Sequence, residues 1–229
     1  MMLSMLIGQA AVVLFFDIVA QDAAEHDDWL THEHMPERLA ISGFLRGSRW
    51  RTSGASSYMV LYEVSDSAVL TSPAYLARLN NPTRWTQEMM KSYRGMSRGL
   101  CRVEWTSGNG LGGAATAFRF RPAAGAEASL RSWLTSVVLP RLPARPGLAG
   151  AALLQSAAAP PVTREQGIRG GPDAGVDWAV VVTGYDAAAL AVLEKEDLNG
   201  DEFVRNGAER APLTAGYGLG YAISRQPPR

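Results

Sequence analysis

The chain has 229 residues, of which 47% are apolar and 19% are charged, which is the balance of a soluble globular protein and not of a disordered one. Lys and Arg together number 22, as do Asp and Glu, so the formal net charge is zero. The sequence therefore predicts neither a nucleic-acid nor a membrane partner, because clustered positive charge is what attracts either surface.

The first sixteen residues are apolar and resemble a signal peptide in composition. They lack the positively charged start that a signal peptide has, and Asp17 follows them directly. The run is also too short to cross a membrane. Cys101 is the single cysteine, so an intrachain disulfide is impossible, and a small buried thiol is the expected role. We expect a cytoplasmic protein.

The first half of the chain predicts the order βαββαβ. Stretches rich in β-branched and aromatic residues predict strands at 11–19, 44–51, 57–64 and 99–105. Helices are expected at 22–34, 66–79 and 83–93. Pro36 should end the first helix, because a proline disfavours helical geometry in the residue before it.

The same order recurs after a glycine-rich linker, so we expect domains at 1–106 and 115–229 with the linker 107–114 between them. The second half predicts strands at 115–121, 149–155, 177–183 and 218–224, and helices at 126–139 and 187–195. An insertion rich in Pro and Gly, 157–175, separates its middle strands. We expect this insertion to be a poorly ordered surface loop away from the core.

The two halves also match residue by residue at an offset of 104. The run 29–31 aligns with 133–135, Pro36 with Pro140, and Gly43 with Gly147. This agreement indicates a tandem duplication. The fold class is therefore predicted as α+β, with two ferredoxin-like units whose antiparallel sheets pack as a pseudo-dimeric α/β barrel. Because the fusion supplies the dimer interface within one chain, a monomer or weak homodimer is expected.

The stretch 29–36, Trp-Leu-Thr-His-Glu-His-Met-Pro, followed by Gly43-Phe44, resembles the EthD-type branch of the dimeric α/β-barrel superfamily. His34-Met35-Pro36 matches the His-x-Pro at the end of that family's first helix, while Ser42 replaces a proline that the family has before the glycine. The superfamily includes isomerases, cofactor-free monooxygenases and haem-degrading enzymes. The resemblance therefore implies a fold and a ligand position between the sheet and helices of one half, but no single reaction.

All three histidines lie in the first helix, at positions 26, 32 and 34. His32 aligns with a serine of the second half, whereas Glu33 and His34 align with Val137 and Val138. Ionisable groups at positions whose counterparts are apolar are costly unless they are paired or functional. We therefore predict His34 and Glu33 as catalytic residues and His32 as a solvent-facing helper. Capping of the helix end by His34 is the alternative interpretation.

Aromatic side chains and an arginine could hold a flat substrate in this half. The predicted substrate-binding residues are Trp29, Arg38, Trp50, Tyr62, Trp85 and Tyr93. No metal site is predicted, because His32 and His34 would point about 200° apart on a helix. No cofactor is expected either.

The predicted function is a cofactor-independent isomerase, lyase or monooxygenase that moves a proton through His34 on a small hydrophobic or aromatic metabolite. The alternative is a non-catalytic protein that binds a small apolar ligand or haem.

Overall fold

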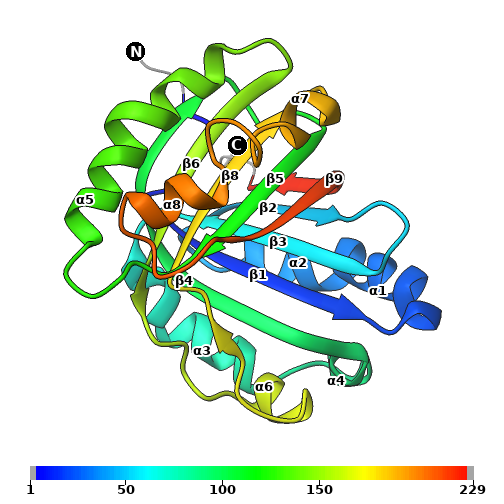
Figure 1. The fold of residues 1–229 in the computed structure, drawn as a ribbon. Helices are drawn as coiled ribbons and strands as arrows, with labels where there is room; N and C mark the ends of the chain where they lie inside the picture. The colour runs from blue at the N-terminus through cyan, green and yellow to red at the C-terminus, as the bar shows by residue number, and fades with distance from the viewer. Residues whose placement is uncertain (1–3, 226–229) are drawn as a thin grey trace. The chain divides into compact units, whose positions relative to one another are not determined.

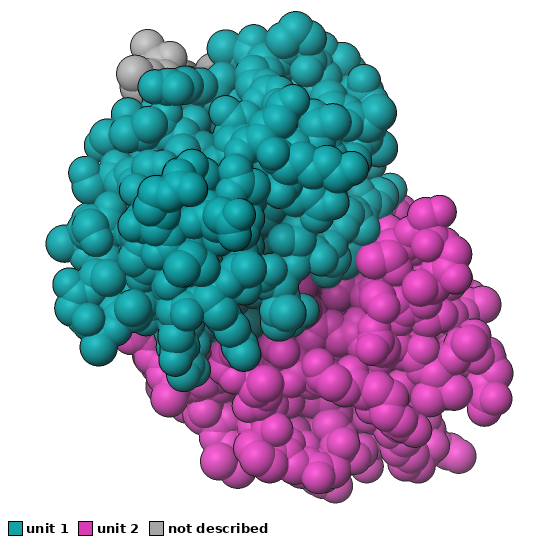
Figure 2. Space-filling view, in the orientation of Figure 1, with its two compact units in different colours: residues 1–6, 103–156, 176–219 teal, residues 7–102, 157–175, 220–229 magenta. Residues whose placement is uncertain are grey.

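The computed structural model describes residues 4–225, which divide into two compact units (Figure 2). Unit 1 comprises 4–6, 103–156 and 176–219 of the described residues, and unit 2 comprises 7–102, 157–175 and 220–225. The first half of the sequence thus forms most of unit 2, and the second half forms most of unit 1.

The sheet of unit 2 pairs four antiparallel strands in the order β4-β1-β3-β2 (Figure 1). The strands are β1 (Ala10–Ile18), β2 (Phe44–Arg51), β3 (Ser57–Val64) and β4 (Tyr93–Gly108). All four were predicted; β2 and β3 have the predicted bounds, and β4 starts earlier than expected.

The first helical path of unit 2 continues through Pro36, so the predicted end of the helix there is wrong. It consists of η1 (Ala20–Asp22), α1 (Ala23–Trp29), the π-helical turn η2 (Leu30–His34) and α2 (Met35–Leu39). In η2 the backbone N–H of Met35 donates to the carbonyl of Leu30, five residues earlier. Pro36 then lies in the first turn of α2, where a proline is tolerated.

The second helical path of unit 2 contains more, shorter pieces than the sequence predicts: η3 (Ser67–Thr71), α3 (Pro73–Asn80), α4 (Arg84–Met89) and η4 (Met90–Ser92). The side chains of Asp66, Ser72 and Thr83 each accept a hydrogen bond from a backbone N–H of the piece that follows. Pro73, at the start of α3, is the physical reason why the predicted helix 66–79 is divided.

The insertion 157–175 packs on unit 2, so the expectation that it lies away from the core is wrong. It forms α6 (Arg164–Ile168) and a two-residue strand, β7 (Ala174–Gly175), which pairs in parallel with β4 at Ser97 and Arg98. Figure 1 places α6 beside α3 and α4, and residues of these helices are in contact. Thr163, Glu165 and Gln166 are buried.

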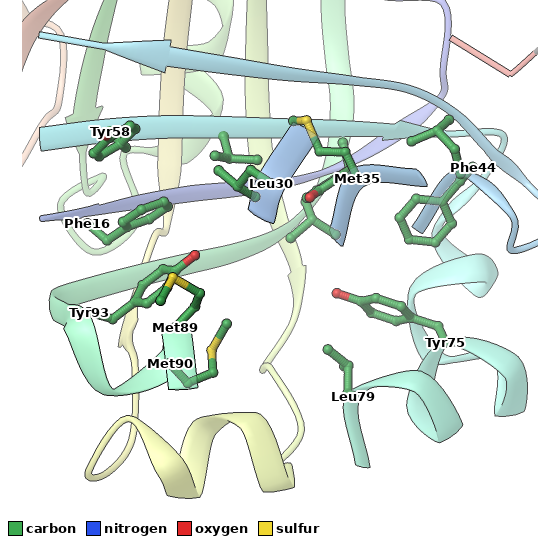
Figure 3. Close-up of a cluster of buried hydrophobic side chains, with 14 of the residues drawn as sticks. Phe16, Leu30, Met35, Phe44, Tyr58, Tyr75, Leu79, Met89, Met90 and Tyr93 are labelled. Atoms are coloured by element: carbon green, nitrogen blue, oxygen red, sulfur yellow. The ribbon is translucent and has the colours of Figure 1, made fainter. Parts of the chain in front are cut away.

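The core of unit 2 fills the space between its sheet and its helices (Figure 3). Phe16 and Tyr58 stack with ring centroids 5.5 Å apart, and Phe16 lies 4.5 Å from Tyr93. Phe44 packs against Tyr75 of α3 at 5.3 Å. The aromatic content that suggested a ligand pocket in this half is therefore largely structural.

Unit 1 repeats the topology, with the strand order β9-β5-β8-β6. The strands are β5 (Ala114–Phe120), β6 (Leu148–Ala158), β8 (Trp178–Gly184) and β9 (Leu213–Ser224). The helices are α5 (Glu127–Ser132), η5 (Trp133–Val138), η6 (Leu139–Ala144), α7 (Ala187–Ala191) and α8 (Gly200–Arg205). The predicted end at Pro140 is wrong for the same reason as at Pro36, because the π-helical turn η5 precedes it.

Within residues 4–225, no helix is long and apolar enough to span a membrane.

The two units also share their irregular features at the offset of 104. The π-helical turns include 30–34 and 134–138, and β-bulges interrupt the pairing between Phe44 and Arg46 and between Leu148 and Gly150. Gly43 and Gly147 both have positive φ, 91° and 87°. The predicted α+β fold with two ferredoxin-like βαββαβ units is confirmed.

Gly43 lies in the bend just before β2, and substitution of this glycine measures how tightly the bend is packed. A Cβ at Gly43 would lie 2.4 Å from Cγ2 of Val69, whereas a Cβ at Gly54, also at positive φ, meets nothing within 4 Å. We expect Gly43→Ala to lower the free energy of unfolding by about 2–4 kcal/mol and Gly54→Ala by about 1 kcal/mol, measured by urea denaturation. Equal losses would contradict this account of the bend.

Candidate functional site

A small buried cavity of about 30 Å³ lies inside unit 2, between its sheet and its helices. Its walls come from β1, β3, β4, the first helical path, α3, η4 and the segment that begins with α6. A cavity of this size has room for one or two water molecules. Four of the predicted site residues line it: His34, Arg38, Tyr62 and Tyr93.

His34 is held in this cavity by the π-helical turn. Its ring lies 4.3 Å from that of Trp29, five residues earlier. An α-helix would separate two such positions by about 140°, whereas hydrogen bonds between residues five apart bring them together. The side chain is 8% exposed, and its Nδ1 is buried without a hydrogen-bond partner among residues 4–225. Burial, and then the charge of Arg38, holds the pKa of His34 well below its usual value, so the ring is neutral at neutral pH.

Glu33 and Trp29 form a network behind His34. Oε1 of Glu33 accepts hydrogen bonds from Trp29 Nε1 at 3.2 Å, Thr83 Oγ1 at 2.5 Å and Thr86 Oγ1 at 3.2 Å. Thr83 is also the N-cap of α4. Neither Glu33 nor Trp29 is among the residues that line the cavity. The network joins the first helical path to α4 and fixes the indole ring on which His34 packs.

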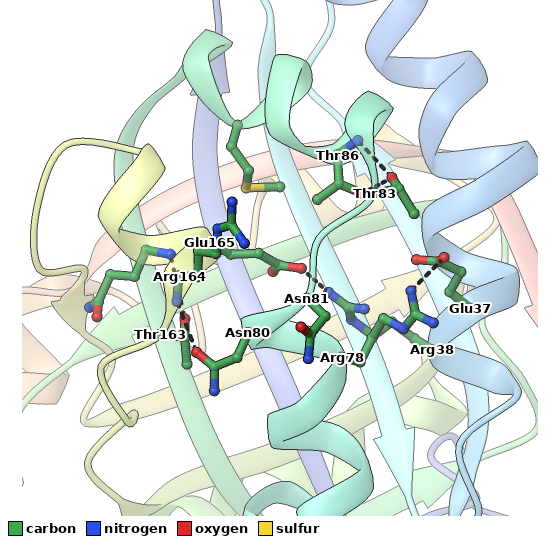
Figure 4. A network of polar contacts seen from close by, with 12 residues as sticks. Glu37, Arg38, Arg78, Asn80, Asn81, Thr83, Thr86, Thr163, Arg164 and Glu165 are labelled. Atoms are coloured by element: carbon green, nitrogen blue, oxygen red, sulfur yellow. Dashed lines mark hydrogen bonds and ion pairs between the residues drawn. The ribbon is translucent and has the colours of Figure 1, made fainter.

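Arg38 carries a charge into the interior. It is 2% exposed, and its Nη2 donates to Oε1 of Glu165 in α6 at 2.7 Å. Both side chains are buried, at 3% and 5% exposure. Nη1 of Arg38 is buried without a hydrogen-bond partner in the described part of the chain. Figure 4 shows this ion pair beside the more exposed pair of Arg78 and Glu37, whose closest atoms are 2.8 Å apart.

Two further arginines line the cavity, and both face Asp173. Arg169 makes two-pronged contacts with this carboxylate, with Nη2 2.7 Å from Oδ2 and Nε 3.2 Å from Oδ1. The Nε of Arg98 lies 3.8 Å from Oδ2 of Asp173, which is too long for a hydrogen bond. All three side chains are buried.

Tyrosines supply the remaining polar atoms of the wall. Burial raises the pKa values of Tyr62, Tyr75 and Tyr93, so these phenols are neutral and can donate. The hydroxyl of Tyr62 is buried and has no hydrogen-bond partner within residues 4–225. The hydroxyl of Tyr93 lies 3.0 Å from Nε2 of His26.

His26, whose role the sequence left open, is a core residue. It is fully buried, and the rings of Phe16, Tyr58 and Tyr93 surround it at centroid distances of 5.5, 4.8 and 5.4 Å. Burial lowers the pKa of His26, although Asp27 opposes the shift. His32 is exposed, as predicted.

Trp50 and Trp85, both predicted to bind substrate, lie elsewhere. The indole of Trp50 is buried and donates to Ser48 Oγ at 2.9 Å, and it does not belong to the core cluster that contains Tyr58 and Tyr62. Side chains alternate along a strand, so Trp50 faces away from the helices of unit 2. Trp85 is half-buried, and its Nε1 lies 3.2 Å from Oε1 of Glu25.

Sequence reasoning missed the residues that the insertion contributes. Glu165, Arg169 and Asp173 follow one another at intervals of four residues, a spacing of charges typical of ion pairs on a helix, although in the structure only Glu165 lies in α6. This signal was present in the sequence. The Pro and Gly content of the segment masked it, because that composition is typical of solvent-exposed loops.

The corresponding place in unit 1 is filled by apolar side chains. Val138, the counterpart of His34, is buried in the core with Leu139, whereas Val137, the counterpart of Glu33, is 43% exposed. Unit 1 also has an open hollow of about 430 Å³, lined by Trp133, Val138, Arg145, Glu196, Asp197, Asn199 and Glu202. This hollow is open and largely polar, unlike the cavity of unit 2.

The described residues hold no group of three His, Cys, Asp or Glu side chains that could bind a metal ion. Without movement of its walls the cavity of unit 2, at about 30 Å³, is far smaller than the volume of about 300–1,000 Å³ of pockets for drug-sized ligands, so it contains no space for haem.

No family model and no curated protein matches the sequence. Solved structures do match. An anthrone oxidase-like protein aligns with a TM-score of 0.66 over 98% of this chain and 97% of that chain, at 10% identity. A candidate monooxygenase from Fusobacterium nucleatum subsp. nucleatum aligns at 0.56 over 96% of both chains, with 8% identity. A candidate chlorite dismutase aligns at 0.53 over 93% of this chain and 95% of that chain, with 10% identity.

These similarities extend over both units, and at such low identity they establish the fold and not the reaction. The chain has the ferredoxin-like fold of dimeric α/β-barrel proteins.

The low pKa of His34 predicts how the stability of the protein depends on pH. An unfolded histidine gains a proton near pH 6.5, whereas the buried ring gains it only at lower pH, so stability is lost as the pH falls below 6.5. We expect the free energy of unfolding of the wild type, minus that of His34→Gln, to decrease between pH 7 and 5. The slope should approach about 1.4 kcal/mol per pH unit.

The control is Leu79→Ala, which alters the same cavity wall without removing a titrating group. Its difference from the wild type should be similar at every pH. A difference between wild type and His34→Gln that does not change with pH would show that His34 is not held neutral by the fold.

Proposed function

We propose that this protein is a cofactor-independent enzyme in which neutral His34 accepts a proton from a small hydrophobic or aromatic substrate. The observation that carries the proposal is the pair formed by His34 and Arg38 on one cavity wall, each buried and each with an unpartnered nitrogen among the described residues. A neutral imidazole is a proton acceptor, and a fixed cation beside it stabilises a developing anion.

The proposed step is removal of a proton from a C–H or O–H group next to a carbonyl or an aromatic ring. The proton goes to His34, and the electron pair of the broken bond moves to a substrate oxygen beside Arg38. Because Arg38 also disfavours a charged His34, the base is weak and suits an acidic substrate proton. An isomerase would return the proton at another carbon, a lyase would expel a leaving group, and a monooxygenase would pass the electrons to dioxygen.

Glu33 and Trp29 act as positioning residues in this proposal. The contact of His34 with the indole, and the bonds from Trp29, Thr83 and Thr86 to Glu33, support this role. Tyr62 and Tyr93 belong to the substrate-binding wall. Trp50 and Trp85 have no place in the proposed site.

We further propose that the chain belongs to the EthD-type branch and arose by tandem duplication. His34-Met35-Pro36 supports the first point. The shared π-helical turns, bulges and positive-φ glycines at one offset support the second, since such irregularities are costly to acquire twice. A neutral net charge and a single buried cysteine support a cytoplasmic protein without a nucleic-acid partner.

A non-catalytic binding protein for a small apolar ligand is the second candidate. The unpartnered polar atoms of Arg38 and Tyr62 on the cavity wall support it, because a bound molecule could satisfy both without any reaction. The two candidates differ in whether a bound molecule exchanges a proton through His34.

The test is hydrogen–deuterium exchange into candidate substrates, followed by ¹H NMR in D₂O. The panel contains hydroxynaphthalenes, anthrones and aryl ketones with an acidic C–H group. We expect the protein to accelerate the loss of at least one C–H signal, and His34→Gln to slow this exchange by about 10²–10⁴-fold, the usual contribution of general acid–base catalysis.

His32→Gln is the matched control, because His32 lies two residues away, is exposed and should leave the rate unchanged. Equal rates for wild type and His34→Gln would contradict catalysis by His34. Binding of panel compounds without exchange would favour the binding protein.

A further inference from the structure

We propose that unit 2 binds a small aromatic monocarboxylate, whose carboxylate takes the place of that of Glu165 on Arg38 while the segment 157–175 moves away as a lid. This inference rests on the proposed function for the location of the site, and it adds the class of ligand and the way that the ligand reaches the site.

Glu165 already presents a carboxylate to the interior of unit 2. Its oxygen lies 2.7 Å from Nη2 of Arg38, in the charge-assisted geometry that a bound carboxylic acid would adopt. Glu165 lines the same cavity as His34, although it lies 127 residues after Arg38 in the chain. The carboxylate of Glu165 thus occupies the position where an anion would bind to Arg38. Because Glu165 belongs to the insertion 157–175, movement of that segment would free this position for a ligand.

The cavity also has an excess of positive charge. Of the described residues, three arginines line it, at 38, 98 and 169, and the carboxylates that face them are Glu165 and Asp173. With Glu165 in place and His34 neutral, the formal sum is one positive charge. Removal of the Glu165 carboxylate from the interior without a replacement would raise this sum to two, which is unfavourable in a buried site. A ligand that replaces Glu165 with one carboxylate leaves the charge balance unchanged, so we infer that the ligand is a monoanion.

Three unpartnered polar atoms support an oxygen-bearing ligand. Nη1 of Arg38, the hydroxyl of Tyr62 and Nδ1 of His34 are each buried, each belongs to a residue of the cavity wall, and none has a hydrogen-bond partner within residues 4–225. Buried polar atoms in folded proteins are rarely without partners. A carboxylate can accept from the guanidinium and the phenol, and an adjacent oxygen or carbon of the ligand can face the histidine.

The rest of the ligand must be apolar and flat. The apolar part of the wall consists of carbon and sulfur atoms and a neutral phenol ring, from Val12, Leu14, Tyr75, Leu79, Met90 and Met96. Such side chains favour an aromatic ring, and the other two arginines of the wall, Arg98 and Arg169, already face Asp173. A cavity of about 30 Å³ cannot contain an aromatic ring together with its carboxylate, so the wall contributed by 157–175 has to move.

The attachment of this segment fits a lid. Besides the Arg38–Glu165 pair, the backbone N–H of Arg164 donates to Asn80 Oδ1 at 3.0 Å (Figure 4). The other polar contacts are few: Pro161 O and Asp173 Oδ2 lie 3.4 and 3.8 Å from nitrogens of Arg98, and Arg169 Nη1 lies 3.2 Å from Met90 Sδ. Pairing of β7 with β4 is limited to two residues. An open hollow of about 400 Å³ adjoins the cavity and shares Tyr93, Met96 and Arg169 with it. Movement of Arg169 would join the two spaces into one of ligand size.

The first experiment measures binding of 2-naphthoate and of its neutral analogue 2-naphthamide by isothermal titration calorimetry. We expect Glu165→Gln, which removes the competing carboxylate, to bind 2-naphthoate at least tenfold more tightly than the wild type. Affinity for 2-naphthamide should change less than twofold. Glu165→Asp keeps the charge on a side chain that is one carbon shorter. This variant serves if Glu165→Gln does not fold, and we expect its affinity for 2-naphthoate to lie between those of the wild type and Glu165→Gln.

Two variants control for the charge itself. Glu37→Gln removes a carboxylate next to Arg38 in sequence, in an ion pair outside the cavity, and should leave the affinity for 2-naphthoate unchanged. Arg38→Gln/Glu165→Gln replaces the buried ion pair by two neutral amides and should lose the binding of 2-naphthoate. The proposal is overturned if Glu165→Gln gains no affinity, if the amide gains as much as the acid, or if the double variant still binds the acid.

The second experiment locks the lid. The backbone N–H of Arg164 in α6 donates to the side chain of Asn80 in α3, so these two positions are chosen for the variant Asn80→Cys/Arg164→Cys, which is designed to join the two helices when oxidised. Oxidation, verified by mass spectrometry, should abolish the binding of 2-naphthoate, and reduction should restore it. Unchanged binding by the oxidised protein would exclude the lid.

The outcomes separate the two proposals. Binding of 2-naphthoate that depends on Arg38 and Glu165, without proton exchange in any panel compound or in an aryl-substituted β-keto carboxylate with an acidic C–H group, supports the ligand class and contradicts the enzyme. Exchange that depends on His34, with no effect of Glu165 on binding, supports the enzyme and contradicts the ligand class.

Discussion

The buried ion pair of Arg38 and Glu165 is the interaction on which the arrangement of the candidate site depends. It joins the first helical path to a segment 127 residues away in the chain, and it closes the cavity that His34 lines. The desolvation of a buried ion pair offsets most of its attraction, whereas removing one partner leaves a buried charge and is strongly unfavourable. The pair therefore adds little net stability but specifies where the segment docks. An anion that competes for Arg38 would act directly on that docking.

A second constraint is the π-helical turn that precedes Pro36. It brings His34 onto Trp29, and through Trp29 it connects the histidine to Glu33, Thr83 and Thr86. Unit 1 has the same turn with Val138 at the position of His34. The backbone geometry is thus common to both units, while the polar groups differ. Because both units have the π-helical turn, the turn is a requirement of the fold. Because only unit 2 has a histidine there, His34 is a feature of the candidate site.

The strands could be predicted because each one carries its own signal. Stretches such as 44–51 and 57–64 are rich in residues that favour a pleated, half-buried surface, and their bounds were correct. The internal match at an offset of 104 likewise requires no knowledge of tertiary structure. The helix ends at Pro36 and Pro140 were wrong because a proline is compatible with a helix when a π-helical turn places it in a first turn, and residue preferences do not encode that turn.

The sequence by itself therefore determined the order βαββαβ in both halves and the concentration of ionisable residues in the first helix. It also led to the prediction that His34 is a catalytic residue. Only the tertiary structure decided which side chains share a cavity with it. Glu165, Arg169 and Asp173 joined the site, and Trp50 and Trp85 did not. The physical reason is the distance along the chain over which each kind of interaction acts. Strand and helix preferences act between residues a few positions apart, whereas a buried charge such as Arg38 is satisfied by whichever distant segment the packing brings to it.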